Sequence, residues 1–591
     1  MQSLVDDTDE EFLLAQGLGT VSVNIRVLDF SHNNLTYIAP YYFRHADLTL
    51  TELHLSHNYL RNITREVFGS MHMLQYLDLS YNKIFHMEYD CFKKVKNLQI
   101  INLSHNHLIE LPVEIFHDMQ SLTSVDLSDN RIKNLADNLI PSPSLERLDL
   151  SNNGLSRIPT NCLSTSAAAN LVELDLSGNT VPAVALSDLV QRFRSLAWLD
   201  LSNNHLVRIE GGSFSALPKL RWLDLSDNSP FNTGERGMTI FKGLERRLSH
   251  LGMKNVSLVS IPSMMLSKLK SLDLSYNNLP SIPPEVTANL TRLRHLDLSY
   301  NDLTAVPVAT HSLAELRWLS LSGNPITALM NTSFYGVSTH LEYLDVTRLR
   351  LRILEHGAFS KIYSLKTLKI TAYSNVRDYN VPKMLTYNSD LENLLIDIED
   401  FTNEFGREMY GIMPSKLKNI TITGKPLKYL SQYLLSGVQS KSLRLTIFNT
   451  SVEELAPEVF YRPGRVRNLT LDLRNNYLIN VPNPSQRAWP GVPNSVFLKD
   501  ILVAGNPLGC DCGIGWIKAW DRKRRQYLCE GPSKCLATRD DVRFATCPTY
   551  YNRTFVDVLM TDLDCEWNKG FLGSANFYIV LGMSILTCLY I

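Results

Sequence analysis

Leu293-Arg294-His295-Leu296-Asp297-Leu298-Ser299-Tyr300-Asn301-Asp302-Leu303 decides the fold, because its spacing returns along nearly the whole chain. Aliphatic residues occupy positions 1, 4, 6 and 11 of this stretch, and asparagine occupies position 9. We count 20 copies, 21 to 30 residues apart, and the stretches 74–84 and 145–155 are equally clear. A period of this length predicts a solenoid, in which each turn buries its apolar side against its neighbours.

Each part of the pattern has its own physical role. The alternating aliphatic residues predict a short strand, because side chains along a strand alternate between its two faces. Successive strands are expected to pair in parallel. The asparagine follows the strand, where its amide can donate to and accept from buried backbone groups. It occupies 14 copies and predicts an asparagine ladder: Asn33, Asn58, Asn82, Asn106, Asn130, Asn153, Asn179, Asn204, Asn228, Asn277, Asn301, Asn324, Asn476 and Asn506.

A second column is expected on the returning side of each turn. Ten residues after the ladder position an aromatic residue recurs, which predicts a spine that packs the return segment against the sheet. Its members are Phe43, Phe68, Phe92, Phe116, Phe214, Phe334, Phe359 and Phe460, with Leu163 in the same slot.

Charge and motifs narrow the function. The 591 residues carry 58 basic and 59 acidic side chains, a formal net charge of −1, so the chain lacks the broad positive field that nucleic-acid binding needs. It has no glycine-rich phosphate loop, no His-Glu-x-x-His and no Gly-x-Ser-x-Gly motif. We therefore expect a binding protein rather than an enzyme, with no cofactor, no metal and no nucleic-acid partner.

Cysteines indicate the compartment. Six of the nine fall between residues 510 and 565: Cys510, Cys512, Cys529, Cys535, Cys547 and Cys565. An even, clustered set predicts disulfides formed in an oxidising compartment. A zinc site is the alternative, but the close pair has a single residue between its members, whereas zinc pairs usually have about two to four. Cys91 and Cys162 lie three repeats apart, about 14 Å by strand spacing, and are expected to be small buried residues without a bridge.

The repeat weakens in two places. Residues 229–256 form a long return that ends with Val256 at the ladder position. Further on, five successive copies lose the asparagine, and the segment 396–411 among them is acidic and aromatic. Either neighbouring repeats tolerate this decay, or the irregular segment is a contact site on a regular scaffold. The five ladder positions are Leu349, Tyr373, Glu399, Lys425 and Thr450.

Two polar rows accompany the strands. His32, His57 and His105 each stand just before a ladder asparagine, and either form a metal site or fill a slot that accepts any polar residue. The second row lies on the solvated face of the sheet and either attracts a basic partner or is only a preference of the repeat. It comprises Asp29, Asp78, Asp126, Asp149, Asp175, Asp200, Asp224, Asp273 and Asp297.

The two ends differ from the array. Residues 1–11 are acidic and lack the basic start and apolar run of a secretory signal, so residues 1–24 are interpreted as the remnant of a longer chain. Residues 571–591 carry no charge and are long enough to span a bilayer. No basic residue follows them, which favours a glycosylphosphatidylinositol (GPI) attachment signal over residues 567–591, with Asn568 as the attachment site. A truncated transmembrane helix is the alternative.

Ten Asn-x-Ser/Thr sequons fit an extracellular chain. Asn34, beside the ladder, and Asn102, on a strand, are expected to escape modification. We expect glycans at the other eight: Asn62, Asn255, Asn289, Asn331, Asn419, Asn449, Asn468 and Asn552.

The repeat resembles that of the leucine-rich-repeat family. The resemblance covers residues 25–508 and implies an α/β solenoid, a curved array of about 20 repeats with a parallel sheet on its concave side. Residues 509–566 resemble the cysteine-rich C-terminal cap of extracellular members. That likeness implies the pairs Cys510–Cys529 and Cys512–Cys565, which leaves Cys535 and Cys547 as an additional bridge.

The unbroken array, the single cap around Gly509-Cys510-Asp511-Cys512-Gly513 and the apolar tail most resemble the chaoptin family of adhesion proteins. The resemblance implies a GPI-anchored protein on the extracellular face of the plasma membrane. It implies binding to a cell-surface protein through the solenoid surface, with a second copy on an apposed membrane as one candidate. The alternative is the ectodomain of a Toll-like ligand-binding receptor or co-receptor without its own signalling domain.

Overall fold

Every copy of the repeat forms a strand in the computed structural model, and neighbouring strands pair in parallel. The structure describes residues 25–510 except 41, 44–47, 70, 186–188, 190–191, 229–239, 263, 338, 400–402 and 485–495, and beyond them 515–518, 520, 546–548, 553–554 and 558. The predictions for residues 1–24 and 567–591 lie outside these residues. Two units, Met1–Asp302 and Leu303–Ile591, divide the chain.

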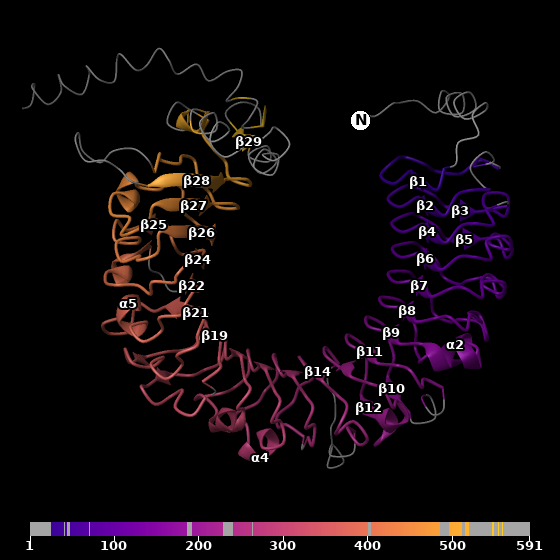
Figure 1. The fold of residues 1–591 in the computed structure, drawn as a ribbon, viewed down its shortest axis with the longest axis horizontal. Coiled ribbons are helices and arrows are strands. Elements are labelled where there is room, and N and C mark those ends of the chain that lie inside the picture. Colours follow the sequence, from indigo (N-terminus) through magenta and orange to yellow (C-terminus); the bar gives the residue numbers. More distant parts are fainter. Residues whose placement is uncertain are drawn as a thin grey trace, which may run out of the picture. The chain divides into compact units, whose positions relative to one another are not determined.

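In the first unit the parallel sheet lies on the inner side of the curve, and the return segments lie on the outer side (Figure 1). Leucines at equivalent positions are in register from strand to strand, as in Leu148 beside Leu174 and Leu199 beside Leu223. The described strands of this sheet are β1 (Val27–Asp29), β2 (Glu52–His54), β4 (Tyr76–Asp78), β6 (Ile100–Asn102), β7 (Ser124–Asp126), β8 (Arg147–Asp149), β9 (Glu173–Asp175), β11 (Trp198–Asp200), β13 (Trp222–Asp224), β14 (His250–Gly252), β15 (Ser271–Asp273) and β16 (His295–Asp297).

The second unit continues the same architecture with longer strands. They are β17 (Trp318–Ser320), β19 (Tyr343–Val346), β21 (Thr367–Ala372), β22 (Asn393–Ile398), β24 (Asn419–Gly424), β26 (Ser442–Thr450), β27 (Asn468–Asp472) and β28 (Phe497–Leu502).

Return segments are built mainly from turns, with little helix. Two-residue parallel ribbons join some of them: β3 (Asn62–Ile63) with β5 (His86–Met87), β10 (Ala183–Val184) with β12 (Arg208–Ile209), β18 (Ala328–Leu329) with β20 (Ile353–Leu354), and β23 (Glu404–Phe405) with β25 (Tyr429–Leu430). Among the described residues the α-helices are α2 (Thr165–Asn170), α4 (Pro284–Thr287) and α5 (Val381–Met384), and the 3₁₀ helices are η1 (Thr160–Cys162), η2 (Ser213–Ala216), η4 (Val308–Ser312), η5 (Arg407–Met409) and η6 (Pro457–Phe460).

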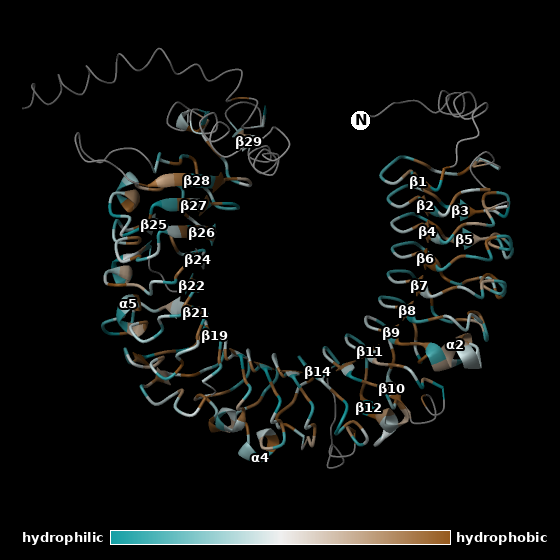
Figure 2. Ribbon diagram, viewed as in Figure 1, coloured by the Kyte–Doolittle hydropathy of each residue, from teal (hydrophilic) through white to brown (hydrophobic). Residues whose placement is uncertain are grey.

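In each unit the core is an apolar column between the strands and the return segments. Figure 2 shows apolar and polar residues alternating along each turn rather than separating into different regions. All nine members of the predicted spine are buried, and the rings of Phe68 and Phe92 lie 5.4 Å apart between centroids. Cys91 and Cys162 are buried and free, as predicted. Nonpolar packing of this kind stabilises each turn only together with its neighbours.

The asparagine ladder is confirmed, and Asn130 shows its geometry. Its buried amide nitrogen donates to the carbonyls of Leu103, Leu127 and Ser128 at 3.0, 3.1 and 3.0 Å. Its amide oxygen accepts the backbone N–H of Leu108 at 3.0 Å. One side chain thus satisfies backbone groups of its own turn and of the preceding turn, which water cannot reach.

In the second unit, longer strands replace the ladder in the turns that lack the asparagine. β21 and β22 stay in register as far as Ala372 beside Ile398, and β24 pairs with β26 beyond the position where other turns bend away. Where asparagine is absent other groups serve the backbone: the Tyr373 hydroxyl donates to the Leu349 carbonyl at 2.9 Å. The lost asparagines therefore mark a change to extended pairing between turns.

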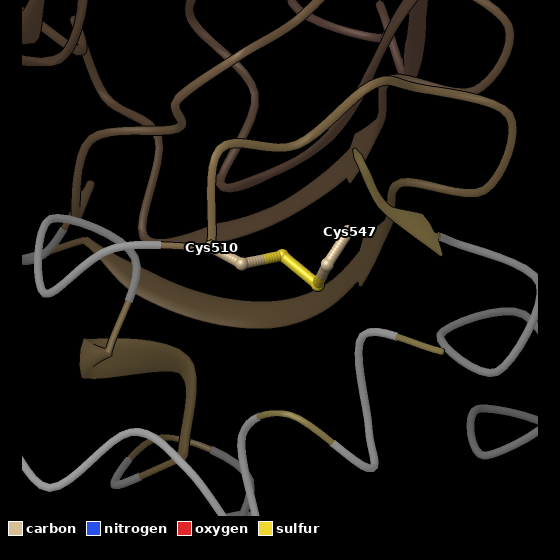
Figure 3. The surroundings of a disulfide bond; sticks show 2 residues. All are labelled: Cys510 and Cys547. Atoms are coloured by element: carbon tan, nitrogen blue, oxygen red, sulfur yellow. A yellow bond between two sulfur atoms is a disulfide. The ribbon is translucent and has the colours of Figure 1, made fainter. Parts of the chain in front are cut away.

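The disulfide found at the C-terminal end corrects the predicted pairing. Cys510 is bonded to Cys547, with 5.7 Å between Cα atoms (Figure 3). The expected bridges of Cys510 to Cys529 and of Cys535 to Cys547 are therefore wrong. The physical reason is the path of the chain. Thr546 forms a parallel β-bridge with Pro507, which brings β29 (Thr546–Cys547) next to the last turn.

The described residues between 515 and 554 make further contacts with the last turns and with one another. β29 pairs antiparallel with β30 (Arg553–Thr554). The indole nitrogens of Trp516 and Trp520 donate to the carbonyls of Val481 and Leu498 at 3.0 and 2.8 Å. Cys512, Cys529, Cys535 and Cys565 lie outside the described residues, so the Cys512–Cys565 pair stays a prediction.

Candidate protein-binding surface

The aspartate row on the inner face of the first unit has a structural role. Each carboxylate accepts the backbone N–H of the serine two residues later, as Asp149, Asp175 and Asp200 do at 2.9, 2.9 and 2.8 Å. Such a bond fixes the turn that leaves the strand. The preference of the repeat for aspartate therefore has a local structural cause, which does not depend on any binding partner.

Packing makes the middle of this row electrostatically unusual. Asp149, Asp175, Asp200 and Asp224 stand beside one another on consecutive strands. Burial first, and neighbouring carboxylates in addition, raise the pKa of Asp149 to about 6 and that of Asp200 to about 7, and the pKa of Asp175 is raised for the same reasons. A cation placed against these groups would favour their charged form and would itself be attracted.

Two tryptophans lie on the same face, and the sequence analysis did not single them out. Trp198 and Trp222 begin β11 and β13, two residues before Asp200 and Asp224, so strand alternation places all four side chains on one side of the sheet. The indoles stack with 4.4 Å between centroids and 14° between planes, and both are only partly buried. The signal was available, because the two residues are 24 apart and share one repeat position.

We call Asp149, Asp175, Asp200, Trp198 and Trp222 the Asp–Trp face. Partly exposed tryptophan is characteristic of the energetic centre of protein interfaces. Tryptophan rings also attract cations through their faces, and carboxylates attract them through charge. The face therefore has the composition needed to bind a basic side chain of a partner protein.

The histidine row is part of a stacked column of rings. Consecutive rings of His32, His57, Tyr81 and His105 lie 4.2, 4.3 and 3.9 Å apart, with interplanar angles below 20°. These four residues have φ between 52° and 57°, in the left-handed region that the turn requires before the ladder asparagine. Within the described part of the chain no cluster of three His, Cys, Asp or Glu side chains could hold a metal ion. Stacking accounts for the row without a metal.

The acidic and aromatic segment 396–411 is partly used by the fold. The Asp397 carboxylate is nearly buried and pairs with the Arg348 guanidinium at 3.2 Å, and Phe405 is buried. Tyr410 is 64% exposed, with an edge contact to Tyr433. Residues 400–402 lie outside the described part. The described contacts account for Asp397 and Phe405 structurally and leave Tyr410 on the surface.

The predicted glycosylation sites differ in exposure. Asn419 is half-buried on β24 and donates to the Asn393 side chain at 2.6 Å. Asn552, like the proposed anchor site Asn568, lies outside the described residues. The other six sites are exposed: Asn62, Asn255, Asn289, Asn331, Asn449 and Asn468. Among the helices that the structure describes, none is long and apolar enough to cross a membrane.

Comparison with known proteins places the chain in a family. The family model for the leucine rich repeat matches residues 49–108, 96–155, 120–181, 169–229, 247–303 and 267–326, and a second leucine-rich-repeat model matches 24–46. Chaoptin of Drosophila melanogaster is 44% identical over 95% of this chain, and Chaoptin of Tribolium castaneum is 47% identical over 87%. The chain is a chaoptin-like leucine-rich-repeat protein.

This chaoptin-like chain spans only part of its relatives, 46% of the Drosophila protein and 66% of the Tribolium protein. Among solved structures, that of the Toll–Spatzle complex of Drosophila has a TM-score of 0.54 and 19% identity, over 87% of this chain and 65% of that one. At that identity the likeness concerns the fold alone.

Proposed function

We propose that the chain is the recognition part of a non-enzymatic cell-surface adhesion protein that binds protein partners through its solenoid surface. The observation that carries the proposal is the 44–47% identity to the two Chaoptin proteins over most of the chain. The partner is a protein on an apposed plasma membrane, and a second copy of this chain is our first candidate.

The Asp–Trp face supports this role physically. Its carboxylates lose hydration and repel one another, which is unfavourable in the free protein. A basic side chain of a partner would relieve both effects, and the stacked indoles supply apolar area that water leaves on binding. We therefore assign the Asp–Trp face as the adhesive surface.

Cell aggregation tests the proposal. Cells that display the chain should cluster with one another, and the double variant Trp198→Ser/Trp222→Ser should abolish clustering, because loss of two interface tryptophans weakens binding by roughly 30-fold or more. The matched control is Tyr335→Ser/Tyr363→Ser, which removes two rings exposed in the second unit. Clustering that survives the tryptophan double variant would exclude the Asp–Trp face. Binding of a soluble ligand without any clustering would favour the receptor or co-receptor alternative.

We also propose a GPI anchor attached at Asn568, with residues 567–591 as the signal. The uncharged stretch 571–591 supports this assignment. Phosphatidylinositol-specific phospholipase C should release the protein from the cell surface. Replacing Asn568 by glutamine, together with replacement of the small residues beside it by large ones, should prevent this release. Retention on the membrane after the enzyme treatment would favour the transmembrane alternative.

Glycosylation follows from the proposed location. The six exposed sequons present asparagine side chains that a glycan can extend from without displacing the core. Asn419 requires its bond to Asn393 to break before it is modified.

A further inference from the structure

A basic hollow in the first unit is lined by residues that are not part of the Asp–Trp face. It has a volume of about 360 Å³ and opens where the return segments enter β13 to β16. Cationic side chains supply nearly all of its lining, including Lys219, Arg221, Arg247, Lys268, Lys270 and Arg292. A protein with a net charge of −1 does not concentrate cations in this way by composition alone.

The repeat arranges these cations in columns. The residue just before the first leucine of a turn is Lys219, Arg247, Lys268 and Arg292 in four consecutive turns. Strand pairing holds these turns side by side, so the first column covers three strand spacings, about 14 Å. A second column, two residues further along, contains Arg221 and Lys270.

Carboxylates neutralise little of the lining: that of Glu245 interacts electrostatically with Arg247, whose guanidinium also donates to the carbonyls of Leu217 and Gly243. None of the six cations forms an ion pair within the part of the chain that the structure describes. Glu245, close by in sequence, has its carboxylate turned to the backbone N–H of Gly243 at 3.0 Å. The positive field also reaches His250, whose pKa is lowered first by burial and then by Lys270.

The second unit shows that the repeat can neutralise the same positions. There the second column alternates in sign, and Glu342 pairs with Lys366 at 2.9 Å and with Arg317 at 3.5 Å. Lys418 likewise pairs with Glu392 at 2.9 Å. The absence of an ion pair at Lys219, Lys268 and Lys270, within the described residues of the first unit, is therefore a local property and not a general feature of this solenoid.

We propose that the hollow binds a linear sulfated polysaccharide of the cell surface or extracellular matrix. A row of cations spread over four turns fits a chain with regularly spaced anionic groups, because a single phosphate or sulfate would contact only one or two of them. Arginine and lysine on flexible stems suit sulfate oxygens as they suit phosphate. The choice of a glycan over other polyanions rests on the cell-surface location in the proposed function. The hollow does not overlap the Asp–Trp face.

Direct binding to heparin, the probe for a sulfated chain, tests this site on the purified full chain. The wild type should bind, and Lys268→Gln/Lys270→Gln/Arg292→Gln should bind roughly tenfold more weakly at physiological salt. The slope of the logarithm of affinity against the logarithm of salt concentration should fall by about one for each cation removed. The control Arg317→Gln/Lys366→Gln/Lys418→Gln removes the same charge from paired positions and should bind like wild type.

Two further probes decide the ligand class. Desulfated heparin should bind much more weakly than heparin, and so should an oligonucleotide of matched charge. Equal binding of the two triple variants would overturn the site, and equal binding of desulfated heparin or of the oligonucleotide would overturn its assignment to sulfated glycans. Because these measurements use purified protein, their failure is distinguishable from a failure of cell aggregation.

Discussion

Replacing Asn130 by alanine removes one rung of the ladder, and the structure shows what would be left behind. The side chain makes four hydrogen bonds, donating to the carbonyls of Leu103, Leu127 and Ser128 and accepting the N–H of Leu108. All four partners lie where solvent does not replace the lost group, since the surrounding turn is buried.

The expected loss is uneven across these partners. The carbonyls of Leu103 and Leu127 each keep the amide of another ladder residue, Asn106 or Asn153, and the third carbonyl keeps a backbone donor. The N–H of Leu108 keeps nothing and costs about 1–3 kcal/mol when left unsatisfied. With weaker bonding at the carbonyls, we expect a loss of local stability of about 3 kcal/mol.

Hydrogen–deuterium exchange measures this loss where it occurs. A change of about 3 kcal/mol corresponds to roughly 100-fold faster exchange in peptides covering residues 103–132. Peptides of the second unit should be unaffected, because a solenoid transmits stability mainly between neighbouring turns. The control Asn278→Ala alters an exposed asparagine just outside the ladder and should change nothing. If Asn130→Ala exchanged within about threefold of wild type in residues 103–132, the ladder would not satisfy the backbone as argued.

Three further outcomes are expected. Burial raises the pKa of Asp200 from 3.8 to about 7, so the folded chain holds a proton that the unfolded chain loses across that range, and stability from this group falls as pH rises through it. Asp200→Asn, which imitates the natural Asn102, should therefore raise the melting temperature by about 1 °C at pH 8 and not at about pH 3, below the unfolded pKa; an equal rise at both pH values would contradict the protonation argument. Cys510→Ser should lower the stability of the C-terminal end by about 4 kcal/mol, because the disulfide closes a loop between two cysteines that are 37 residues apart in sequence. Peptide mapping without reduction that finds another partner for Cys510 would refute this disulfide. Asn289, exposed after α4, should carry a glycan in secreted protein, and an unmodified peptide there would show that exposure is insufficient.

The features that sequence predicted best are those that one repeat determines by itself. Strand positions, the inward leucines, the ladder and the Phe spine follow from spacing, because a side chain such as Asn130 or Phe92 has the same neighbours in every turn. The Asp–Trp face depends on contacts between turns. Trp198 and Trp222 become a stacked pair only once β11 and β13 are in register. The raised pKa of Asp200 depends on burial that spacing does not reveal.

The cap and the irregular turns were less predictable for a different reason. Cys510 has several cysteines within reach along the sequence, and only the return path of β29 selects Cys547. Loss of the asparagine at Tyr373 signalled a change but not its nature, since extended pairing and decay leave the same absence in the sequence. The sequence shows the cations at residues 219–221 and 268–270, but it does not show whether carboxylates lie within ion-pair distance of them.

The ladder also gives the array a direction. Asn130 accepts the N–H of Leu108 and donates to the carbonyl of Leu103, and both partners belong to the preceding turn. Asn324 likewise accepts the N–H of Leu303 in the turn before it. Wherever a turn carries the asparagine, that side chain thus completes the backbone hydrogen bonding of the turn before it. Shortening such a protein from its amino-terminal side would leave the backbone N–H groups of the remaining turns with their asparagine partners, whereas cutting from the other side would remove the asparagine that serves the last turn. Lengthening or trimming of these arrays, in nature or by design, should therefore be tolerated more readily at the amino-terminal end.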